Sequence, residues 1–419
     1  MIELLISNVQ MKHRSIQLFS IYIILFLFYN TNQTSTQKTT KKLILSPHVF
    51  SFQGVSSSSN KCVSCNNDVL SQVCATQSVA PYIRRGFSRC IVNHFLDHHF
   101  NSRIRNTTWP YPTHAAFQAL SEWIVDQPEY GCAFSPIDVK CGDVIYLKQD
   151  LMDTFLANDA QRIKYPFIAI THSSDKSIPS FYARSWLQEN NTDLRLYRWF
   201  GINMRLADTP HIMKPIPLGL SSPGWVHDPT YSSYLYDHFE ISTLLRKKLV
   251  DFINKPFKPS LGTPDERIVA SFQVITNKVE RLSAIQGVKN LGITELNTEV
   301  KHLNDATEAQ LWPTRLRKSL FVFAPQGNGI DTHRIYEALM NAAIPIVRAG
   351  VYDEILACLP FIQIIRWEEM VWRDLVEGAK DILDRLDAGL YDFRRLFVNH
   401  YAKLIEEASK EAKLLCEKG

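Results

Sequence analysis

Segments with the pattern of buried strands alternate with helical segments along much of this 419-residue chain. In the amino-terminal half, short apolar runs predict strands, and the stretches between them predict helices. Strands are expected at 143–147, 166–171, 195–200 and 213–218, and helices at 151–163 and 181–188. Because a strand–helix–strand order produces parallel pairing, the pattern predicts an α/β protein whose parallel sheet is covered on its faces.

A second alternating unit follows a proline-rich stretch. Residues 254–264 contain three prolines and a glycine, which predicts a linker between two domains. A chain of this length can bury more than one core, because single cores stop growing at roughly 250–300 residues. Beyond the linker, strands are expected at 268–275, 320–324, 344–347 and 361–365, helices at 278–286 and 332–341, and an amphipathic helical tail over 374–413.

The amino-terminal 60 residues have the pattern of a targeting segment and a stem. Lys12 and Arg14 precede an apolar run at 16–29, and a polar stretch follows it. The run is shorter than the roughly 20 residues of an average membrane span, but no small-residue cleavage site follows it. We therefore expect an uncleaved anchor with a cytosolic amino terminus, in preference to a cleaved signal peptide or a buried core helix.

The cysteines indicate an oxidising compartment. Six of the eight lie within 62–141 and are expected to form disulfides of open connectivity; the other two are Cys358 and Cys416. A zinc site at Cys62 and Cys65 would need a second, suitably spaced ligand pair, and is disfavoured. Sequons for glycosylation in a lumen occur at Asn32, Asn106 and Asn190. The expected location is the Golgi or endoplasmic reticulum membrane, with a lumenal domain.

Residues 321–339 carry the most informative functional pattern. An apolar strand leads into a loop with Gly327 and Gly329, and a helix follows whose N-cap is expected at Asp331 or Thr332. This order directs unpaired backbone N–H groups and the positive end of a helix dipole to the carboxyl edge of the sheet, where parallel sheets bind anions. The pattern therefore predicts a site that fits a diphosphate.

Two charged side chains belong to the start of that helix. The guanidinium of Arg334 can contact two phosphate oxygens. Glu337 lies three residues later on the same helix face, where its carboxylate is expected to accept hydrogen bonds from ribose hydroxyls. An ordinary capped helix with an Arg–Glu pair is the structural alternative. No lysine follows the glycines as a phosphate-loop nucleotidase requires, which disfavours a soluble kinase.

Residues 324–347, which read APQGNGIDTHRIYEALMNAAIPIV, resemble the carboxyl-terminal signature of exostosin-like glycosyltransferases. That family has Pro-Arg-Gly-x-Gly, an arginine, Glu-Ala-Leu and Ile-Pro-Val in the same order. A looser similarity to the family covers 166–175, 199–203 and 215–220. One departure is Gln326, which stands where the family usually has arginine and removes a positive charge near the expected phosphate site. Arg334 and Lys318 remain as candidate cations, so altered donor preference is expected rather than loss of activity.

The resemblance implies a GT-B fold, in which two Rossmann-like domains with parallel sheets face a cleft. Residues 1–60 would be the tail, anchor and stem, 61–260 the acceptor-side domain, and 261–419 the nucleotide-sugar-binding domain. The implied reaction transfers a sugar from a UDP- or GDP-sugar to a glycan or glycoprotein in the secretory pathway. The alternative function is that of an inactive lumenal relative that binds glycans or acts as a chaperone, and Gln326 favours it.

The resemblance also implies the donor-binding residues. Arg334 would hold the diphosphate and Glu337 the ribose, and His333 is a candidate for contact with the sugar. The remaining implied contacts to phosphate and sugar come from the preceding loop: Gly327, Asn328, Gly329, Asp331 and Thr332.

A base for the acceptor hydroxyl is expected in the other half of the chain. His172 and Asp175 are the candidates, because they follow the strand at 166–171, again at a carboxyl strand end; a structural turn is the alternative. No Asp-x-Asp motif lies between apolar strands, so no metal or other cofactor is expected. A histidine-rich group at 94–99 has helical spacing for a metal site, but a solvated helix face is preferred. The net charge of +4 without a long basic run disfavours a nucleic-acid partner.

Overall fold

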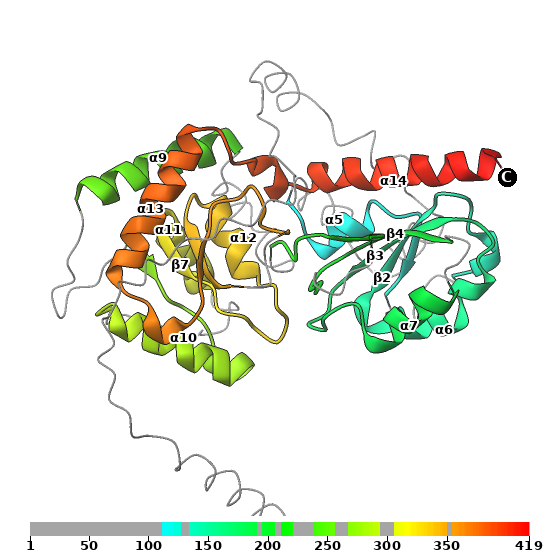
Figure 1. The fold of residues 1–419 in the computed structure, drawn as a ribbon, viewed down its shortest axis with the longest axis horizontal. Coiled ribbons are helices and arrows are strands. Elements are labelled where there is room, and N and C mark those ends of the chain that lie inside the picture. The colour runs from blue at the N-terminus through cyan, green and yellow to red at the C-terminus, as the bar shows by residue number, and fades with distance from the viewer. Residues whose placement is uncertain are drawn as a thin grey trace, which may run out of the picture. The chain divides into compact units, whose positions relative to one another are not determined.

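Two parallel sheets carry the fold of this protein (Figure 1). The structure is a computed structural model that describes residues 111–126, 134–190, 195–205, 211–220, 238–255, 267–293, 306–349 and 354–418. Every strand pair in both sheets is parallel. The predicted α/β class with parallel sheets is therefore confirmed.

The first sheet has five strands in the order β1-β2-β3-β4-β5. These strands are β1 Trp123–Val125, β2 Val144–Lys148, β3 Phe167–His172, β4 Leu196–Gly201 and β5 Met213–Pro215. All six residues of β3 are buried, as expected for a central strand covered on both faces. The associated helices are α5 His114–Gln118, α6 Met152–Asn158 and α7 Phe181–Asn190, with short 3-10 turns at Pro136–Asp138, Gln149–Leu151 and Ala160–Arg162.

The second sheet has four strands in the order β6-β7-β8-β9. They are β6 Ile268–Val269, β7 Phe321–Phe323, β8 Ile344–Arg348 and β9 Ile362–Ile364. The helices of this part are α9 His238–Asn254, α10 Lys278–Asn290, α11 Ala306–Lys318, α12 His333–Met340 and α13 Trp372–Asp387. Three 3-10 turns lie at Val274–Asn277, Trp367–Glu369 and Phe393–Leu396, and helix α14, Val398–Lys418, ends the described chain.

The carboxyl-terminal helix α14 completes the core of the first sheet rather than the second. Its buried side chains Val398, Tyr401 and Ile405 share a hydrophobic cluster with residues of β2, β3 and β4. Figure 1 shows α14 running beside that sheet. The range 261–419 expected for the second domain thus includes a helix that packs on the first sheet, and the expected boundary at 260/261 lies outside the described residues.

Helix α9 comes before the strands of the second sheet in the sequence, and it packs on that second sheet. Leu245, Leu249 and Phe252 belong to the same cluster as the strands β7 and β8. One polar residue of α9 also points inward: the ammonium group of Lys248 donates to the backbone oxygens of Ser319, Asn341 and Ala342 at 2.8, 3.1 and 2.9 Å. These carbonyls follow the ends of α11 and α12. Lys248 therefore caps the carboxyl ends of two helices and fixes their positions.

Two predicted elements are wrong in extent. The strand expected at 268–275 ends at Val269, because the chain turns into a 3-10 helix and Asn277 caps α10 through its side-chain oxygen, which accepts from the backbone N of Glu280. The tail at 374–413 contains two long helices instead of one. Gly389 has a φ of +67° after α13 and breaks the helical path before α14.

A disulfide joins Cys141 to Cys416 and so ties the end of α14 to the turn before β2. The expectation that the six cysteines within 62–141 pair among themselves is therefore wrong, because Cys141 pairs with a cysteine 275 residues away. Cys358 is also disulfide-bonded. The predicted anchor at 16–29 lies outside the described residues, and none of the helices that the structure does describe has the length and apolarity of a membrane span.

Candidate functional site

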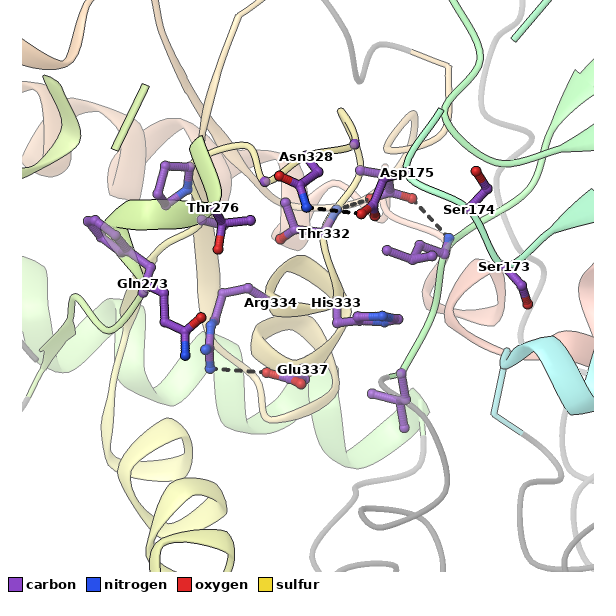
Figure 2. A pocket seen from close by; sticks show the side chains of 18 of the residues that line it. Ser173, Ser174, Asp175, Gln273, Thr276, Asn328, Thr332, His333, Arg334 and Glu337 are labelled. Carbon is purple, nitrogen blue, oxygen red and sulfur yellow. Dashed lines mark hydrogen bonds and ion pairs between the residues drawn. The ribbon is translucent and has the colours of Figure 1, made fainter. Parts of the chain in front are cut away.

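A cavity of about 790 Å³ lies where the carboxyl ends of β3 and β7 meet the start of α12. Its wall includes every site residue predicted from the sequence: His172, Asp175, Gly327, Asn328, Gly329, Asp331, Thr332, His333, Arg334 and Glu337. Figure 2 shows the polar side chains of this wall gathered around one space. The fold thus brings the candidates from both halves of the sequence together at a single site.

Helix α12 begins at the cavity. Of the two expected N-cap residues, Thr332 is the one in the N-cap position, with extended backbone and no capping hydrogen bond from its side chain. Its buried hydroxyl oxygen has no hydrogen-bond partner in the described part of the chain. The N–H groups of the first turn of α12 therefore have no side-chain acceptor from Thr332, and the helix dipole favours an anion at this end.

Asp331 acts as a structural tie in the wall of the cavity. Its carboxylate accepts hydrogen bonds from the backbone N of Leu218 at 2.9 Å, the hydroxyl of Tyr336 at 2.6 Å and the backbone N of Thr332 at 2.8 Å. Burial raises the pKa of Asp331 to about 6, against the opposing effect of these donors. Because its oxygens are engaged by protein donors, Asp331 shapes the loop for a ligand rather than presenting a free carboxylate to it.

Asn203, which lies in the looser similarity at 199–203 but was not predicted as a site residue, joins the two loops that form the cavity. It follows β4 with a φ of +52°, a conformation that asparagine tolerates. Its side-chain oxygen accepts from the backbone N of Asp331 at 2.8 Å, and its amide nitrogen donates to the backbone oxygen of Ser174 at 2.9 Å. Gly329 is required beside it, because a Cβ there would lie 2.8 Å from the Asn203 amide nitrogen.

Arg334 and Glu337 form a fixed pair that faces the cavity (Figure 2). Their side chains meet at 3.1 Å between Nη1 and Oε2. Trp312 of α11 holds both: its ring centroid lies 3.8 Å from the guanidinium carbon of Arg334, and its Nε1 donates to Oε2 of Glu337 at 3.2 Å. Sequence patterns did not identify Trp312. Both recorded bonds to Glu337 use Oε2, so Oε1 is the oxygen left for a ligand.

Arg281 of α10 is a second arginine in the wall of the cavity, and no sequence pattern identified it. Its Nε donates to the backbone oxygen of Gln326 at 3.0 Å. One sequence signal pointed to such a residue: Gln326 replaces the arginine of the similar family, so another cation is needed near the loop. Lys318, which was expected to supply that charge, is not part of the cavity wall.

The histidines of the site are neutral at physiological pH. Nδ1 of His172 accepts a hydrogen bond from the backbone N of Ser173 at 2.8 Å, which assigns the ring proton to Nε2. Burial, reinforced by His114 and His333, lowers the pKa of His172 to about 3. Burial also lowers the pKa values of His114 and His333. A base with so low a pKa accepts a proton poorly near pH 7.

Asp175 differs from His172 because its carboxylate is exposed at the edge of the cavity. Oδ2 of Asp175 accepts a hydrogen bond from the side-chain amide of Asn328 at 3.1 Å. This contact joins the loop after β3 to the glycine-containing loop after β7, as Figure 2 shows. Of the two predicted base candidates, Asp175 is therefore the one whose environment suits proton transfer.

Other predicted features lie elsewhere. Within the described residues no three histidine, cysteine or acidic side chains are grouped to hold a metal ion. The histidine-rich group at 94–99 and the pair Cys62 and Cys65 lie outside those residues. Comparison with known proteins adds no assignment: no protein-family model matches the chain, and no curated protein matches it. The functional interpretation rests on the site itself and on the resemblance over 324–347.

Proposed function

We propose that this protein is an exostosin-like glycosyltransferase that moves a sugar from a UDP- or GDP-sugar to a hydroxyl of a glycan or glycoprotein. The observation that carries the proposal is the Arg334–Glu337 pair at the start of α12, which lines the cavity instead of lying in the core or on an outer surface. A nucleoside diphosphate needs both functions of this pair: a cation for phosphate, and a carboxylate that accepts hydrogen bonds from ribose hydroxyls.

The proposed architecture is GT-B, with the donor on the second sheet and the acceptor mainly on the first. The presence of two parallel sheets whose carboxyl edges contribute to one cavity supports it. The leaving diphosphate is stabilised by the amino terminus of α12 and by Arg334, so developing negative charge meets preorganised donors. Gly327 and Gly329 allow the backbone of the loop to approach the phosphates closely.

In the proposed reaction, Asp175 accepts the proton of the acceptor hydroxyl as the new glycosidic bond forms. Its exposed carboxylate lies at the cavity edge where an acceptor hydroxyl can reach it, whereas the buried imidazole of His172, whose pKa is lowered to about 3, accepts a proton poorly near pH 7. His172 instead supports the loop, because it fixes the backbone at Ser173 through Nδ1. His333 bonds to the backbone oxygen of Gly219 through Nδ1 at 2.7 Å, which leaves its other ring nitrogen for the donor sugar.

The proposed location is the lumen of the Golgi or endoplasmic reticulum, with membrane attachment through residues 16–29. The Cys141–Cys416 disulfide supports an oxidising compartment. The alternative is a silent lumenal relative that binds glycans or acts as a chaperone, and the neutral side chain of Gln326 is the feature that favours it.

The test is incubation of the purified protein with a panel of UDP- and GDP-sugars and assay of transfer or hydrolysis. One donor is expected to be consumed, and Arg334→Ala is expected to abolish consumption while the thermal unfolding midpoint stays close to that of the wild type. An intact protein that binds no nucleotide in a calorimetric screen would favour the silent alternative.

A further inference from the structure

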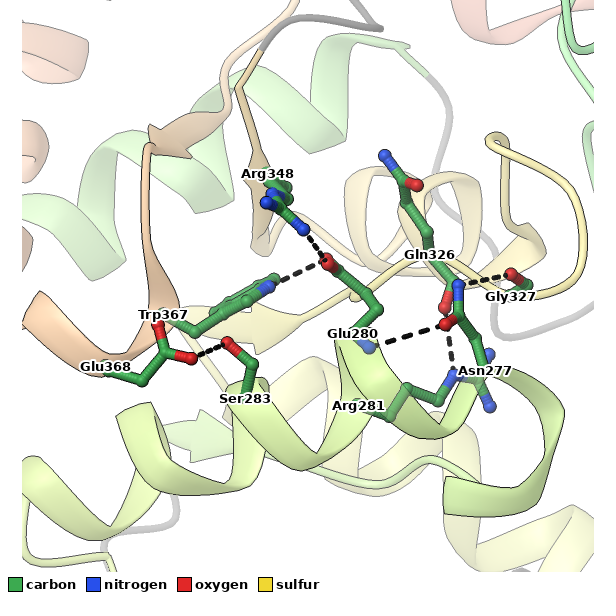
Figure 3. A network of polar contacts seen from close by, with 9 residues as sticks. All are labelled: Asn277, Glu280, Arg281, Ser283, Gln326, Gly327, Arg348, Trp367 and Glu368. Carbon is green, nitrogen blue, oxygen red and sulfur yellow. Dashed lines mark hydrogen bonds and ion pairs between the residues drawn. The ribbon is translucent and has the colours of Figure 1, made fainter. Parts of the chain in front are cut away.

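Arg281 is a partly buried cation of the cavity wall, and no carboxylate among the described residues forms an ion pair with it. The adjacent Glu280 does not serve, because its carboxylate is engaged elsewhere. Glu280 accepts from Nη1 of Arg348 at 2.6 Å and from Nε1 of Trp367 at 2.7 Å. Figure 3 shows Glu280 directed toward Arg348 and Trp367, whereas Arg281 is directed toward the loop at Gln326. A partly buried guanidinium that forms no ion pair loses part of its hydration, so this side chain is suited to a ligand that supplies an anion.

The guanidinium of Arg281 is held in place by uncharged groups. Nε donates to the backbone oxygen of Gln326 at 3.0 Å, and Nη1 donates to the backbone oxygen of Gln273 at 2.6 Å. The N-cap residue Asn277 also donates from its side chain to the backbone oxygen of Gly327 at 3.0 Å (Figure 3). The first turn of α10 is thus fastened to the loop that was expected to bind phosphate, and the hydrogens of Nη2 remain for a ligand.

The guanidinium of Arg281 lies close to the backbone of that loop. A Cβ on Gly327 would lie 3.2 Å from Nη2 of Arg281, so the absence of a side chain at 327 lets the guanidinium come beside the loop backbone. Burial and the charge of Arg334 both lower the pKa of Arg281, which reflects two like charges near one cavity. Arg334 forms an ion pair with Glu337, whereas Arg281 forms none with the described residues, although the charge of Glu280 partly offsets its own.

We propose that Arg281 binds the donor's diphosphate together with Arg334 and supplies the positive charge that is absent at Gln326. This inference rests on the proposed function and deepens it, because it assigns a second arginine to the diphosphate of the donor. Two guanidinium groups in the wall of one cavity match a pyrophosphate that carries two phosphoryl groups. The donor is therefore a nucleoside diphosphate sugar, and a nucleoside monophosphate sugar such as a CMP-sugar is a poor ligand.

The first test measures the affinity of the wild-type protein by isothermal titration calorimetry. The ligands are UDP, GDP, UMP, GMP, CMP and inorganic pyrophosphate. One nucleoside diphosphate is expected to bind at least ~10-fold more tightly than its monophosphate, because the second phosphoryl group gains charge-assisted hydrogen bonds. Equal affinities for diphosphate and monophosphate would overturn the proposal without any variant being needed.

The second test replaces Arg281. Arg281→Gln is expected to weaken binding of the nucleoside diphosphate and of pyrophosphate by roughly 10- to 100-fold, and binding of the monophosphate by much less. Lys278→Gln is the matched control, because Lys278 is an exposed cation on the same helix, and it should leave all affinities unchanged. The double variant Arg281→Gln/Gln326→Arg is expected to regain affinity, because it returns a guanidinium to the site from the loop.

These outcomes separate the inference from the function on which it rests. Wild-type diphosphate affinity in folded Arg281→Gln would overturn the role of Arg281 and leave the glycosyltransferase proposal standing. A wild-type protein that binds pyrophosphate in an Arg281-dependent way, but no nucleotide, would support the anion site and contradict the donor class. A wild-type protein that binds none of these ligands would overturn both proposals.

Discussion

The burial of His172 leads us to predict that acid lowers the free energy of unfolding of this protein. The imidazole is only 2% exposed, and burial lowers its pKa from the ordinary value of 6.5 to about 3. The unfolded chain therefore takes up a proton at this site below pH 6.5, whereas the folded protein does not until about pH 3. Between pH 6.5 and about pH 3 the unfolded state therefore binds more protons than the folded state. The free energy of unfolding falls as the pH is lowered through this range.

The size of the effect follows from the pKa difference. A pH of 4.5 is two units below the pKa of the imidazole in the unfolded chain, whereas the imidazole in the folded protein is still neutral at that pH. Each unit corresponds to about 1.4 kcal/mol, so His172 should account for ~3 kcal/mol of the stability lost between pH 7 and pH 4.5. His172→Asn removes this titration, and the asparagine oxygen can still accept the hydrogen bond from the backbone N of Ser173.

The assay is urea unfolding at pH 7 and at pH 4.5. His172→Asn is expected to be less stable than the wild type at pH 7, because the smaller side chain leaves a gap, but to lose ~3 kcal/mol less between the two pH values. His211→Asn is the control, since His211 is exposed, and it should follow the wild type. An equal pH dependence in His172→Asn and the wild type would refute the neutral, buried assignment and restore His172 as a candidate base.

Further changes test the reaction, the scaffold and the loop. Asp175→Asn is expected to lower the transfer rate by about 10²- to 10⁴-fold with donor affinity unchanged in calorimetry, and an unaltered rate would exclude it as the base. Lys248→Met leaves three buried carbonyls without their donor and should destabilise the protein by ~2–4 kcal/mol in urea unfolding. The control Lys247→Met changes an exposed lysine of the same helix and should stay within ~0.5 kcal/mol of the wild type. Equal stabilities of the two variants would contradict the capping role of Lys248. Gly329→Ala should displace the side chain of Asn203 and weaken nucleotide binding, and a crystal structure with both Asn203 bonds intact would contradict this reasoning.

The sheets were predictable where strands are buried and bounded by polar residues. The strands β3 and β8 agree closely with the apolar runs at 166–171 and 344–347. The sequence analysis missed helix α9, whose packing partners lie in the other half of the sequence. The extent of β6 was overestimated, because the apolar run continues to residue 275, inside the 3-10 helix that leads to the cap at Asn277.

The local part of the site was predictable for a similar reason. Gly327, Gly329, Arg334 and Glu337 all lie within one strand–loop–helix segment, so spacing alone places them at one sheet edge. Arg281 was invisible at that stage, because an arginine on a helix has many possible roles. Only the packing of α10 against the loop shows that its guanidinium shares the cavity with Arg334.

The same limit applies to the residues that hold the site together. Trp312 contacts the Arg334–Glu337 pair from α11, and Asn203 reaches Asp331 from the loop after β4. Neither residue has a spacing relation to the glycine-containing loop, because the contacts depend on how the two sheets bring their carboxyl edges to one cavity. The pairing of Cys141 with Cys416 was unpredictable for the same reason, since it depends on the return of α14 to the first sheet.

The most direct measurement is a calorimetric titration of UDP and of GDP into the purified wild-type protein and into Arg334→Gln. The wild type should bind one of these nucleotides at a single site, and Arg334→Gln should lose at least ~10-fold in affinity while keeping its thermal unfolding midpoint. Failure of the folded wild-type protein to bind either nucleotide, or undiminished binding by Arg334→Gln, would contradict the assignment of this cavity to a nucleotide-sugar donor.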